Sequence, residues 1–259
     1  MNAPKTLQPK VELDKTREAL LALGLGHSAE VLGDRLATAV KGDLAPHRFL
    51  DELLAAEIAH RDEKRVRTSL RLSGLPTGQT LESFDWSFQP GIDRKRIETL
   101  ATCSFVREHE VVLFQGPPGV GKTHLAIALG VKAVAAGFGV NFYRLDDLLA
   151  VMKRDADTPP RKLKGKKYMS TSLLIIDEVG FQELTRQEAA LLFRLVSCRY
   201  QKGSTIITTN KSVKDWPEIL AGDEAMATAM LDRLLHHCHV FNVKGRSYRL
   251  RDLERQIKP

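Results

Sequence analysis

The sequence predicts an α/β protein: a parallel sheet covered by helices on both faces, with a small all-α domain before it. Beyond residue 76, short apolar runs alternate with segments of helical periodicity, which is typical of parallel strands joined by crossover helices. The residues before 76 contain no strand-like run and show only helical patterns. With 259 residues, the chain is long enough for one large domain and a smaller one.

Three helices are expected in the amino-terminal part, at residues 15–23, 28–41 and 46–72. In the third, apolar residues recur at helical spacing and are expected to face a small core or a partner: Phe49, Leu50, Leu53, Leu54 and Ile58. A stretch rich in Gly, Pro and Thr follows at 73–78 and predicts a linker. We therefore expect two domains, 1–76 and 77–259.

The second domain is expected to contain five strands, at residues 111–114, 140–143, 173–176, 205–208 and 239–243. Helical patterns between them cover 122–136 and 146–153. A third helix, up to Tyr200, begins at the capping box Thr185-Arg186-Gln187-Glu188. Continuously apolar strands separated by helices predict a sheet that is buried on both faces.

A glycine-rich loop follows the first of these strands. The phosphate-binding pattern GxxxxGK followed by Ser or Thr is matched by Gly116, Pro117, Pro118, Gly119, Val120, Gly121, Lys122 and Thr123, with His124 next. Backbone N–H groups and the helix dipole favour a polyphosphate at such a loop. We expect Lys122 to reach the β/γ-phosphates and the Thr123 hydroxyl to hold Mg²⁺. A Gly/Pro surface turn is the alternative, but a chance match is rare, roughly one in a hundred.

Polar residues follow two further strands, at the edge where ligands bind in open α/β sheets. Asp177 and Glu178 end the run Leu173–Ile176, and Asn210 ends the run at 205–208. We expect Asp177 to orient Mg²⁺, Glu178 to polarise a water for attack on the γ-phosphorus, and Asn210 to hold that water. A solvated loop start and a turn-forming Asn are the alternatives. Together the residues predict a nucleoside triphosphatase, although a nucleotide switch that seldom hydrolyses fits them too.

The composition excludes several classes of protein. The three cysteines, Cys103, Cys198 and Cys238, are far apart and suggest neither a zinc site nor disulfides. We expect a soluble cytoplasmic protein with no membrane association, because neither a secretory signal nor a membrane-spanning stretch is evident. A net charge of +7 is compatible with a polyanionic partner.

Basic residues gather in two segments. The first lies in the long amino-terminal helix and contains Arg61, Lys64, Arg65, Arg67 and Arg71; the second contains Arg161, Lys162, Lys164, Lys166 and Lys167. A solvated helix face explains the first as well as nucleic-acid contact does. Because neither segment carries interleaved aromatic residues, duplex DNA bound through its phosphates is favoured over a single strand.

Several of these motifs together resemble those of AAA+ ATPases: residues 116–124, Asp177-Glu178, Asn210 and Met230-Leu231-Asp232-Arg233. More narrowly, residues 80–90, 92–95 and 245–249 resemble the IstB-like family, which comprises ATP-dependent helpers of insertion-sequence transposases related to the DnaC helicase loader. The similarity covers residues 49–251. It implies ATP and Mg²⁺ as cofactors, a homo-oligomer with ATP sites shared between subunits, and a transposase as partner.

The resemblance also assigns roles to single residues. Lys122 and Thr123 match the first nucleotide motif, Asp177 and Glu178 the second, and Asn210 the first sensor. Arg233 matches the arginine finger that reaches a neighbour's ATP site. Phe84 and Trp86 match the segment that lines the adenine side, although core packing would explain them nearly as well. The resemblance further implies a parallel P-loop AAA+ sheet without the usual C-terminal helical lid.

The function expected from the resemblance is that of a DNA-binding accessory ATPase of transposition, which assembles on duplex DNA and presents it to a transposase. A DnaC-like replicative helicase loader, with the same ATP chemistry, is the alternative. A P-loop kinase acting on a small molecule is a third possibility. Glu178 directly after Asp177, together with Asn210, disfavours the kinase.

Overall fold

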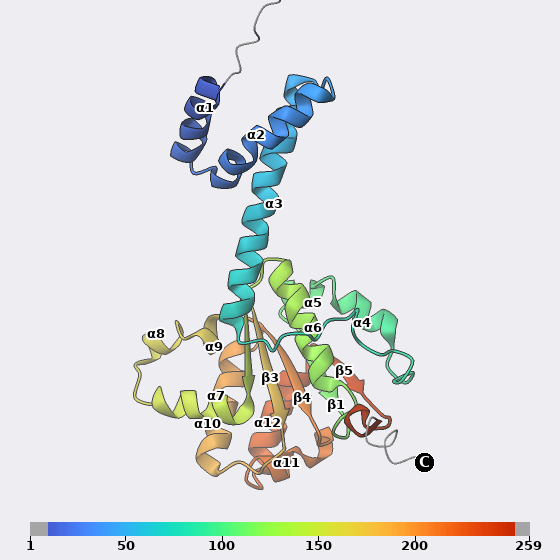
Figure 1. Cartoon of the computed structure of the whole chain (residues 1–259). Helices are drawn as coiled ribbons and strands as arrows, with labels where there is room; N and C mark the ends of the chain where they lie inside the picture. The colour runs from blue at the N-terminus through green and yellow to red at the C-terminus, as the bar shows by residue number, and fades with distance from the viewer. Residues whose placement is uncertain (1–9, 252–259) are drawn as a thin grey trace, which may run out of the picture. The chain divides into compact units, whose positions relative to one another are not determined.

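Five parallel strands form the central sheet, in the order β2-β3-β4-β1-β5 (Figure 1). The structure is a computed structural model and describes residues 10–251, apart from the side chains of residues 10–12, 160 and 161. The strands are β1 Val111–Gln115, β2 Val140–Arg144, β3 Leu173–Val179, β4 Ser204–Thr209 and β5 Cys238–Asn242. The expected α/β class with a parallel sheet is confirmed.

By its internal contacts the chain divides into two units, Met1–Thr68 and Ser69–Pro259. The division falls inside helix α3 (Pro46–Ser73), whereas the sequence analysis placed the boundary at residue 76, just after that helix. The first unit also contains α1 (Lys10–Ala22) and α2 (Gly26–Lys41).

A buried carboxylate organises the first unit. Glu57 of α3 accepts a hydrogen bond from the Ser28 backbone N–H (2.8 Å) and another from the Arg61 guanidinium (2.8 Å). The Ser28 hydrogen bond, supported by Arg61, holds the pKa of the Glu57 carboxyl below its usual range. Of the apolar residues expected to face a core, Leu53 is buried and Phe49 half-buried, whereas Leu50, Leu54 and Ile58 are exposed.

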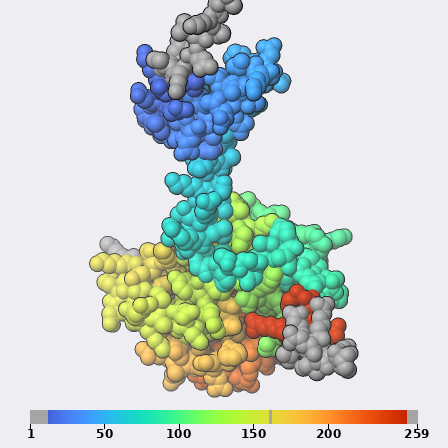
Figure 2. All heavy atoms as spheres, in the orientation of Figure 1, coloured from blue at the N-terminus to red at the C-terminus, as the bar shows by residue number. Residues whose placement is uncertain are grey.

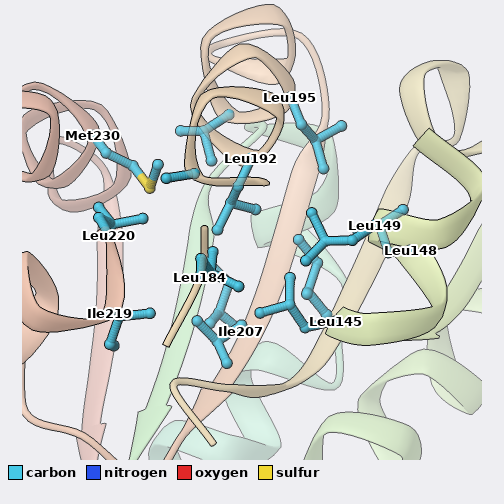
Figure 3. Packing of buried hydrophobic residues seen from close by; sticks show 14 of the residues in the cluster. Leu145, Leu148, Leu149, Leu184, Leu192, Leu195, Ile207, Ile219, Leu220 and Met230 are labelled. Atoms are coloured by element: carbon cyan, nitrogen blue, oxygen red, sulfur yellow. The ribbon is translucent and has the colours of Figure 1, made fainter. Parts of the chain in front are cut away.

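Helices cover both faces of the sheet. On one face α6 (Lys122–Ala135) packs so closely that a Cβ on its Gly130 would lie 2.7 Å from Ile175 of β3. On the other face, α7 (Leu145–Arg154), α10 (Arg186–Arg199), α11 (Trp216–Ile219) and α12 (Glu224–Leu235) form one buried cluster with Leu113, Leu174, Ile176 and Ile207 of the strands. Figure 3 shows part of this cluster, with Ile207 of β4 beside the leucines of α7 and α10. Burial of each such leucine or isoleucine contributes about 1.5–3 kcal/mol.

The other elements of the second unit are short: α4 (Arg94–Leu100), α5 (Ser104–Arg107), α8 (Pro160–Leu163), α9 (Lys167–Ser170) and η1 (Val213–Asp215). The expected capping box is present at the start of α10, where Thr185 and Glu188 bond each other's backbone. No helix in the described part combines the length and hydropathy that a bilayer-spanning segment requires.

Candidate nucleotide-binding site

The phosphate loop, residues 116–123, joins the end of β1 to the start of α6 at the carboxyl edge of the sheet. Gly121 precedes the first helical residue with φ at +97°, a conformation that L side chains rarely adopt. A Cβ at Gly121 would also lie 2.7 Å from the Phe84 ring. The glycine therefore permits both the turn into the helix and the close approach of Phe84.

Lys122 lies inside the loop. Its side chain is buried, and its ammonium group donates hydrogen bonds to the carbonyls of Gly116 and Pro117, both at 2.7 Å. Burial lowers the pKa of Lys122, while the nearby carboxylates Asp177 and Glu178 oppose that shift. The loop thus encloses a cation whose hydrogen-bond partners are carbonyls, for which phosphate oxygens would compete.

Two hydroxyls converge on one carboxylate beside Lys122. Thr123 donates to Asp177 Oδ1 at 2.8 Å, and Thr208 of β4 donates to the same oxygen at 2.5 Å. Asp177 is 4% exposed. A hydroxyl next to a carboxylate supplies the oxygen ligands that Mg²⁺ prefers, so the residues present fit this ion.

A bulge at the end of β3 places both acidic residues at the same edge. The pairing of β3 with β4 shifts register between Ile176 and Val179, and Glu178 has φ at +63°. In a regular strand, neighbouring side chains would point to opposite faces. The bulge instead lets Asp177 meet Thr123 while Glu178 faces the smaller of two pockets, with the Thr208 hydroxyl accepting from its backbone N–H at 3.0 Å.

The Glu178 carboxylate is paired with Arg144, which ends the neighbouring strand β2. This pair is accessible to solvent, with side chains 60% (Arg144) and 36% (Glu178) exposed. The hydrogen bond to Glu178 and the negative charge of that carboxylate raise the pKa of Arg144, so the guanidinium stays charged.

Two pockets adjoin the phosphate loop. The larger, about 420 Å³ and here called the nucleotide pocket, is lined by Phe84, Gly119, Val120, Gly121, Lys122, Thr123, His124 and Ile127, among others. The smaller, about 90 Å³ and here called the distal pocket, is lined by Pro118, Gly119, Lys122, Thr123, Glu178, Phe181, Thr208, Thr209, Asn210 and Arg249. A cavity of the larger size suits a small-molecule ligand.

The aromatic residues expected near adenine occupy different places. Phe84 lines the nucleotide pocket, whereas Trp86 is not among its lining residues. Trp86 packs edge-on against Phe84, with ring centroids 4.8 Å apart, and its indole N–H donates to the Leu81 carbonyl. His124 lines the pocket and is fixed by a hydrogen bond to the Thr80 carbonyl (2.8 Å). Trp86 thus packs against the Phe84 ring without lining the pocket itself.

Arg233 does not reach the phosphate loop of its own chain. Its guanidinium donates to the Ala229 carbonyl of α12 at 2.6 Å and lies 5.2 Å from the centre of the Phe193 ring. It lines a different cavity, together with the last turns of α10 and with Val111 and Thr205 near the amino ends of β1 and β4. Any contact with an ATP site would therefore be with another subunit's.

The basic residues expected to meet DNA divide into paired and unpaired ones. Arg61 bonds Glu57 and the Gly24 carbonyl, while Asp62, Glu63 and Asp155 pair respectively with Arg65, Arg67 and Lys166. Of the ten residues expected to contact DNA, five have exposed side chains that form no hydrogen bond or ion pair with the described part of the chain: Lys64, Arg71, Lys162, Lys164 and Lys167. The segment 162–167, yellow in Figure 2, lies on the surface. The side chain of Arg161 is outside the described part.

Sequence reasoning missed three contributors to the site: Thr208, Arg144 and Arg249. The pairing of the strands brings Thr208 and Arg144 to the site. Thr208 is the second-last residue of β4, and Arg144 of β2 lies opposite Asp177 of β3. Had the strand order been known, their positions at strand ends would have identified them. Arg249 follows β5, and only its place within the family-like ending 245–249 singled it out.

The chain is similar to proteins of bacterial insertion sequences. The "Insertion sequence IS21 putative ATP-binding protein" of Pseudomonas aeruginosa is 44% identical over 236 residues, which cover 91% of this chain and 89% of that protein. The "Insertion sequence IS5376 putative ATP-binding protein" of Geobacillus stearothermophilus is 44% identical over 204 residues, 79% of this chain and 81% of that protein.

Solved structures share the fold at low identity. The DnaC helicase loader matches with a TM-score of 0.51 and 22% identity, covering 64% of this chain and 97% of that one. A replication initiator DnaA bound to AMPPCP and single-stranded DNA matches with a TM-score of 0.51 and 19% identity, covering 71% and 56%. The fold is thus the P-loop AAA+ fold. The model of the IstB-like ATP binding protein family matches residues 18–256, so the chain belongs to that family.

Proposed function

We propose that this protein is an ATP-hydrolysing, DNA-binding accessory of transposition, which assembles on duplex DNA and presents it to a transposase. The observation that carries the proposal is the convergence of Lys122, the hydrogen-bonded pair Thr123 and Asp177, and Glu178 around adjoining pockets. A cation, a metal-binding oxygen pair and a carboxylate are the groups that phosphoryl transfer to water requires.

The proposed chemistry divides these groups by role. Lys122 binds the phosphate chain, and Glu178 orients the attacking water and accepts its proton. Asn210, which also lines the distal pocket, holds that water by hydrogen bonding. Mg²⁺, held by Thr123 and Asp177, would neutralise part of the phosphate charge when bound. Because Arg144 occupies the Glu178 carboxylate, hydrolysis requires Glu178 to release or share this partner.

The proposed role of Arg233 requires more than one subunit. Its position away from its own phosphate loop supports a role in trans, as an arginine finger for a neighbouring subunit. Hydrolysis would then depend on assembly, and assembly on DNA would stimulate it. A homo-oligomer with shared ATP sites is the form of the protein that this proposal requires.

Unpaired lysines and arginines support binding to DNA phosphates. Lys162, Lys164 and Lys167 lie on one exposed segment, and Lys64 and Arg71 lie on α3. Each phosphate that such a residue neutralises releases condensed counterions, so affinity should fall steeply as salt rises. Phosphate contacts carry no direct sequence information, and binding with little sequence preference is expected.

The choice of a transposase as partner depends on the relatives from insertion sequences. Their identity of 44% over most of the chain favours a role in transposition. The likeness to the DnaC helicase loader, at 22% identity, concerns the fold alone. Co-purification with a transposase encoded beside it would support the proposal, and co-purification with a replicative helicase instead would replace it.

The deciding experiment measures ATP turnover with and without Mg²⁺ and duplex DNA, together with particle size in ATP. We expect Mg²⁺-dependent hydrolysis that rises with DNA, and larger assemblies when ATP is present. The double variant Lys162→Ala/Lys164→Ala should bind DNA with a shallower salt dependence, whereas Lys202→Ala/Lys214→Ala, which removes exposed lysines elsewhere, should not. Absence of ATP hydrolysis under all conditions would overturn the proposal.

A further inference from the structure

Strand β5 lies at one end of the sheet and is paired on one side only, with β1. The pairing continues just beyond the strand, where the Val243 N–H donates to the Gln115 carbonyl at 2.8 Å. Because the backbone groups of successive strand residues point to opposite sides, those of Cys238, Val240 and Asn242 point away from β1. Within residues 10–251 these outer N–H and carbonyl groups have no hydrogen-bond partner, so β5 presents a free edge.

The other edge of the sheet, β2, differs because the chain itself runs beside it. A Cβ on Gly74, which has φ at +72°, would lie only 3.2 Å from the Phe142 carbonyl oxygen of β2. Glycine at position 74 permits this approach of backbone to backbone. An uncovered edge strand is a template for pairing with a further chain. The two edges therefore differ in what they offer to another molecule, and β5 is the one that can accept a strand.

Exposed cations lie around the carboxyl end of β5. They are here called the cationic rim and comprise Lys95, Arg96, Lys244 and Arg246. The Arg96 guanidinium lies 4.5 Å from the centre of the Phe241 ring of β5, and Lys244 follows the strand directly in the chain. The Gln89 side-chain amide donates to the Arg246 carbonyl at 2.9 Å and holds this residue in place. Two segments that are far apart in the sequence thus bring their charges to one end of the strand.

The acidic residues near the cationic rim are engaged elsewhere. Asp93 accepts a hydrogen bond from the Arg96 backbone N–H at 3.1 Å, and Glu98 pairs with Arg94 at 2.7 Å. None of the four rim side chains forms a hydrogen bond or ion pair with the part of the chain that the structure describes. A guanidinium that lies over an aromatic ring, as that of Arg96 does, keeps its N–H groups free for an oxyanion. The cationic rim therefore favours an anionic partner.

We propose that β5 and the cationic rim bind an extended, acidic segment of a partner protein, which adds a strand to the sheet. The outer backbone groups of Cys238, Val240 and Asn242 supply the main-chain hydrogen bonds, and the rim pairs with Asp or Glu side chains of the segment. DNA could meet the charges, but it has no amide backbone to pair with a strand edge. The inference does not depend on the ATP chemistry proposed above, because no rim residue lines the nucleotide pocket or the distal pocket.

The test titrates the full chain into a short fluorescent peptide of alternating Glu and Val residues and measures anisotropy. We expect this acidic peptide to bind and a matched peptide of alternating Lys and Val residues not to bind. Arg96→Ala/Lys244→Ala should weaken binding of the acidic peptide about tenfold. Lys202→Ala/Lys214→Ala, which removes the same charge at exposed positions elsewhere, should bind it as the wild type does. N-methylation of alternate peptide residues removes the donors that a strand offers to β5 and should abolish binding.

Three results would overturn the inference. Failure of the acidic peptide to bind the wild type removes the docking site. Equal binding of the N-methylated peptide shows that no strand is added. If Arg96→Ala/Lys244→Ala binds the peptide normally but loses affinity for duplex DNA, the cationic rim belongs to a nucleic-acid surface instead. Each of these results can occur while ATP turnover is intact, so the proposed function is tested separately.

Discussion

Arg144 and Glu178 form an ion pair at the ends of adjacent parallel strands, β2 and β3. Arg144 thereby bonds the same Glu178 carboxylate that we propose orients the attacking water. The pair is solvent-accessible, and exposed pairs contribute only about 0–1 kcal/mol. Such a pair is weak enough to exchange during a catalytic cycle, and under the proposed function it would limit hydrolysis until DNA or a neighbouring subunit intervenes.

Replacing Arg144 by Ala should therefore raise ATP turnover without DNA, by up to about fivefold, because an exposed pair of up to about 1 kcal/mol no longer retains Glu178. Arg144→Lys should stay closer to the wild type, since it keeps a cation near Glu178. Steady-state phosphate release measures the effect. A fall in turnover similar to that of a Glu178 variant would show that Arg144 assists hydrolysis.

Glu178→Gln should bind ATP normally and hydrolyse it about 10²–10⁴-fold more slowly, because the amide cannot accept a proton from water. The variant should also remain on DNA as an ATP-bound assembly. Glu183→Gln, at an exposed position in the loop after β3, is the matched control and should turn over ATP like the wild type. Rapid hydrolysis by Glu178→Gln would remove its assignment as the base.

Lys122→Ala should abolish ATP binding, because the loop loses the one cation that lies among its own carbonyls. Lys132→Ala, on the same helix but paired with Glu82 at the surface, should retain it. Calorimetric titration with ATP and Mg²⁺ distinguishes the two. Affinity near that of the wild type in Lys122→Ala would end the site assignment.

Arg233→Ala should lose roughly 10³-fold or more of the ATP turnover if it acts as a finger in trans. Mixing it with Lys122→Ala subunits, which bind no ATP but still carry Arg233, should restore part of the activity. Arg186→Ala, at an exposed position of α10, serves as the control substitution. If mixing restores nothing, the shared site between subunits loses its main support.

Acid should weaken α10 through Glu188. The hydrogen bond from Lys153, followed by the Thr185 backbone N–H, lowers the pKa of Glu188 from 4.5 to about 2. Because the folded-state pKa is the lower one, the stabilisation is present above pH 4.5 and is lost as the pH falls towards 2. Glu188→Gln should thus lower the free energy of unfolding at pH 7 by about 0.3–1 kcal/mol, and less at pH 3.

Urea titration at both pH values, followed by fluorescence of the buried Trp216, measures the effect of Glu188→Gln. Glu183→Gln controls for the loss of an exposed charge. A difference between Glu188→Gln and wild type that is as large at pH 3 as at pH 7 would show that the hydrogen bonds, not the charge, stabilise the start of α10.

The sequence predicted the fold class because its local signals agree. Apolar runs of strand length alternate with amphipathic helices, and the observed β1 and β3 begin where the pattern placed them, at Val111 and Leu173. The glycine-rich loop predicted a connection between a strand and a helix, and in the structure it connects β1 to α6, which begins at Lys122. Short helices such as α8 and α9 were not anticipated, because four residues carry too little periodicity.

The site was less accessible to sequence reasoning, because much of it is made by contacts between distant segments. The bulge at Glu178 depends on the register of β3 against β4 and leaves no compositional trace. Trp86 shows that an aromatic residue in the expected segment need not line the pocket, because it packs against Phe84 and only Phe84 is among the lining residues. The position of Arg249 could be found only by knowing that the segment after β5 returns to Gly119, where the Tyr248 N–H bonds the Gly119 carbonyl.

The irregularity at the end of β3 has a consequence for how this chain tolerates change. Ile176 and Val179 both belong to the buried cluster beneath α7 and α10, although two residues, not one, separate them. Losing either Asp177 or Glu178 would restore strict alternation and leave a single carboxylate to face both Thr123 and the distal pocket. Length at this spot is therefore as tightly constrained as residue identity.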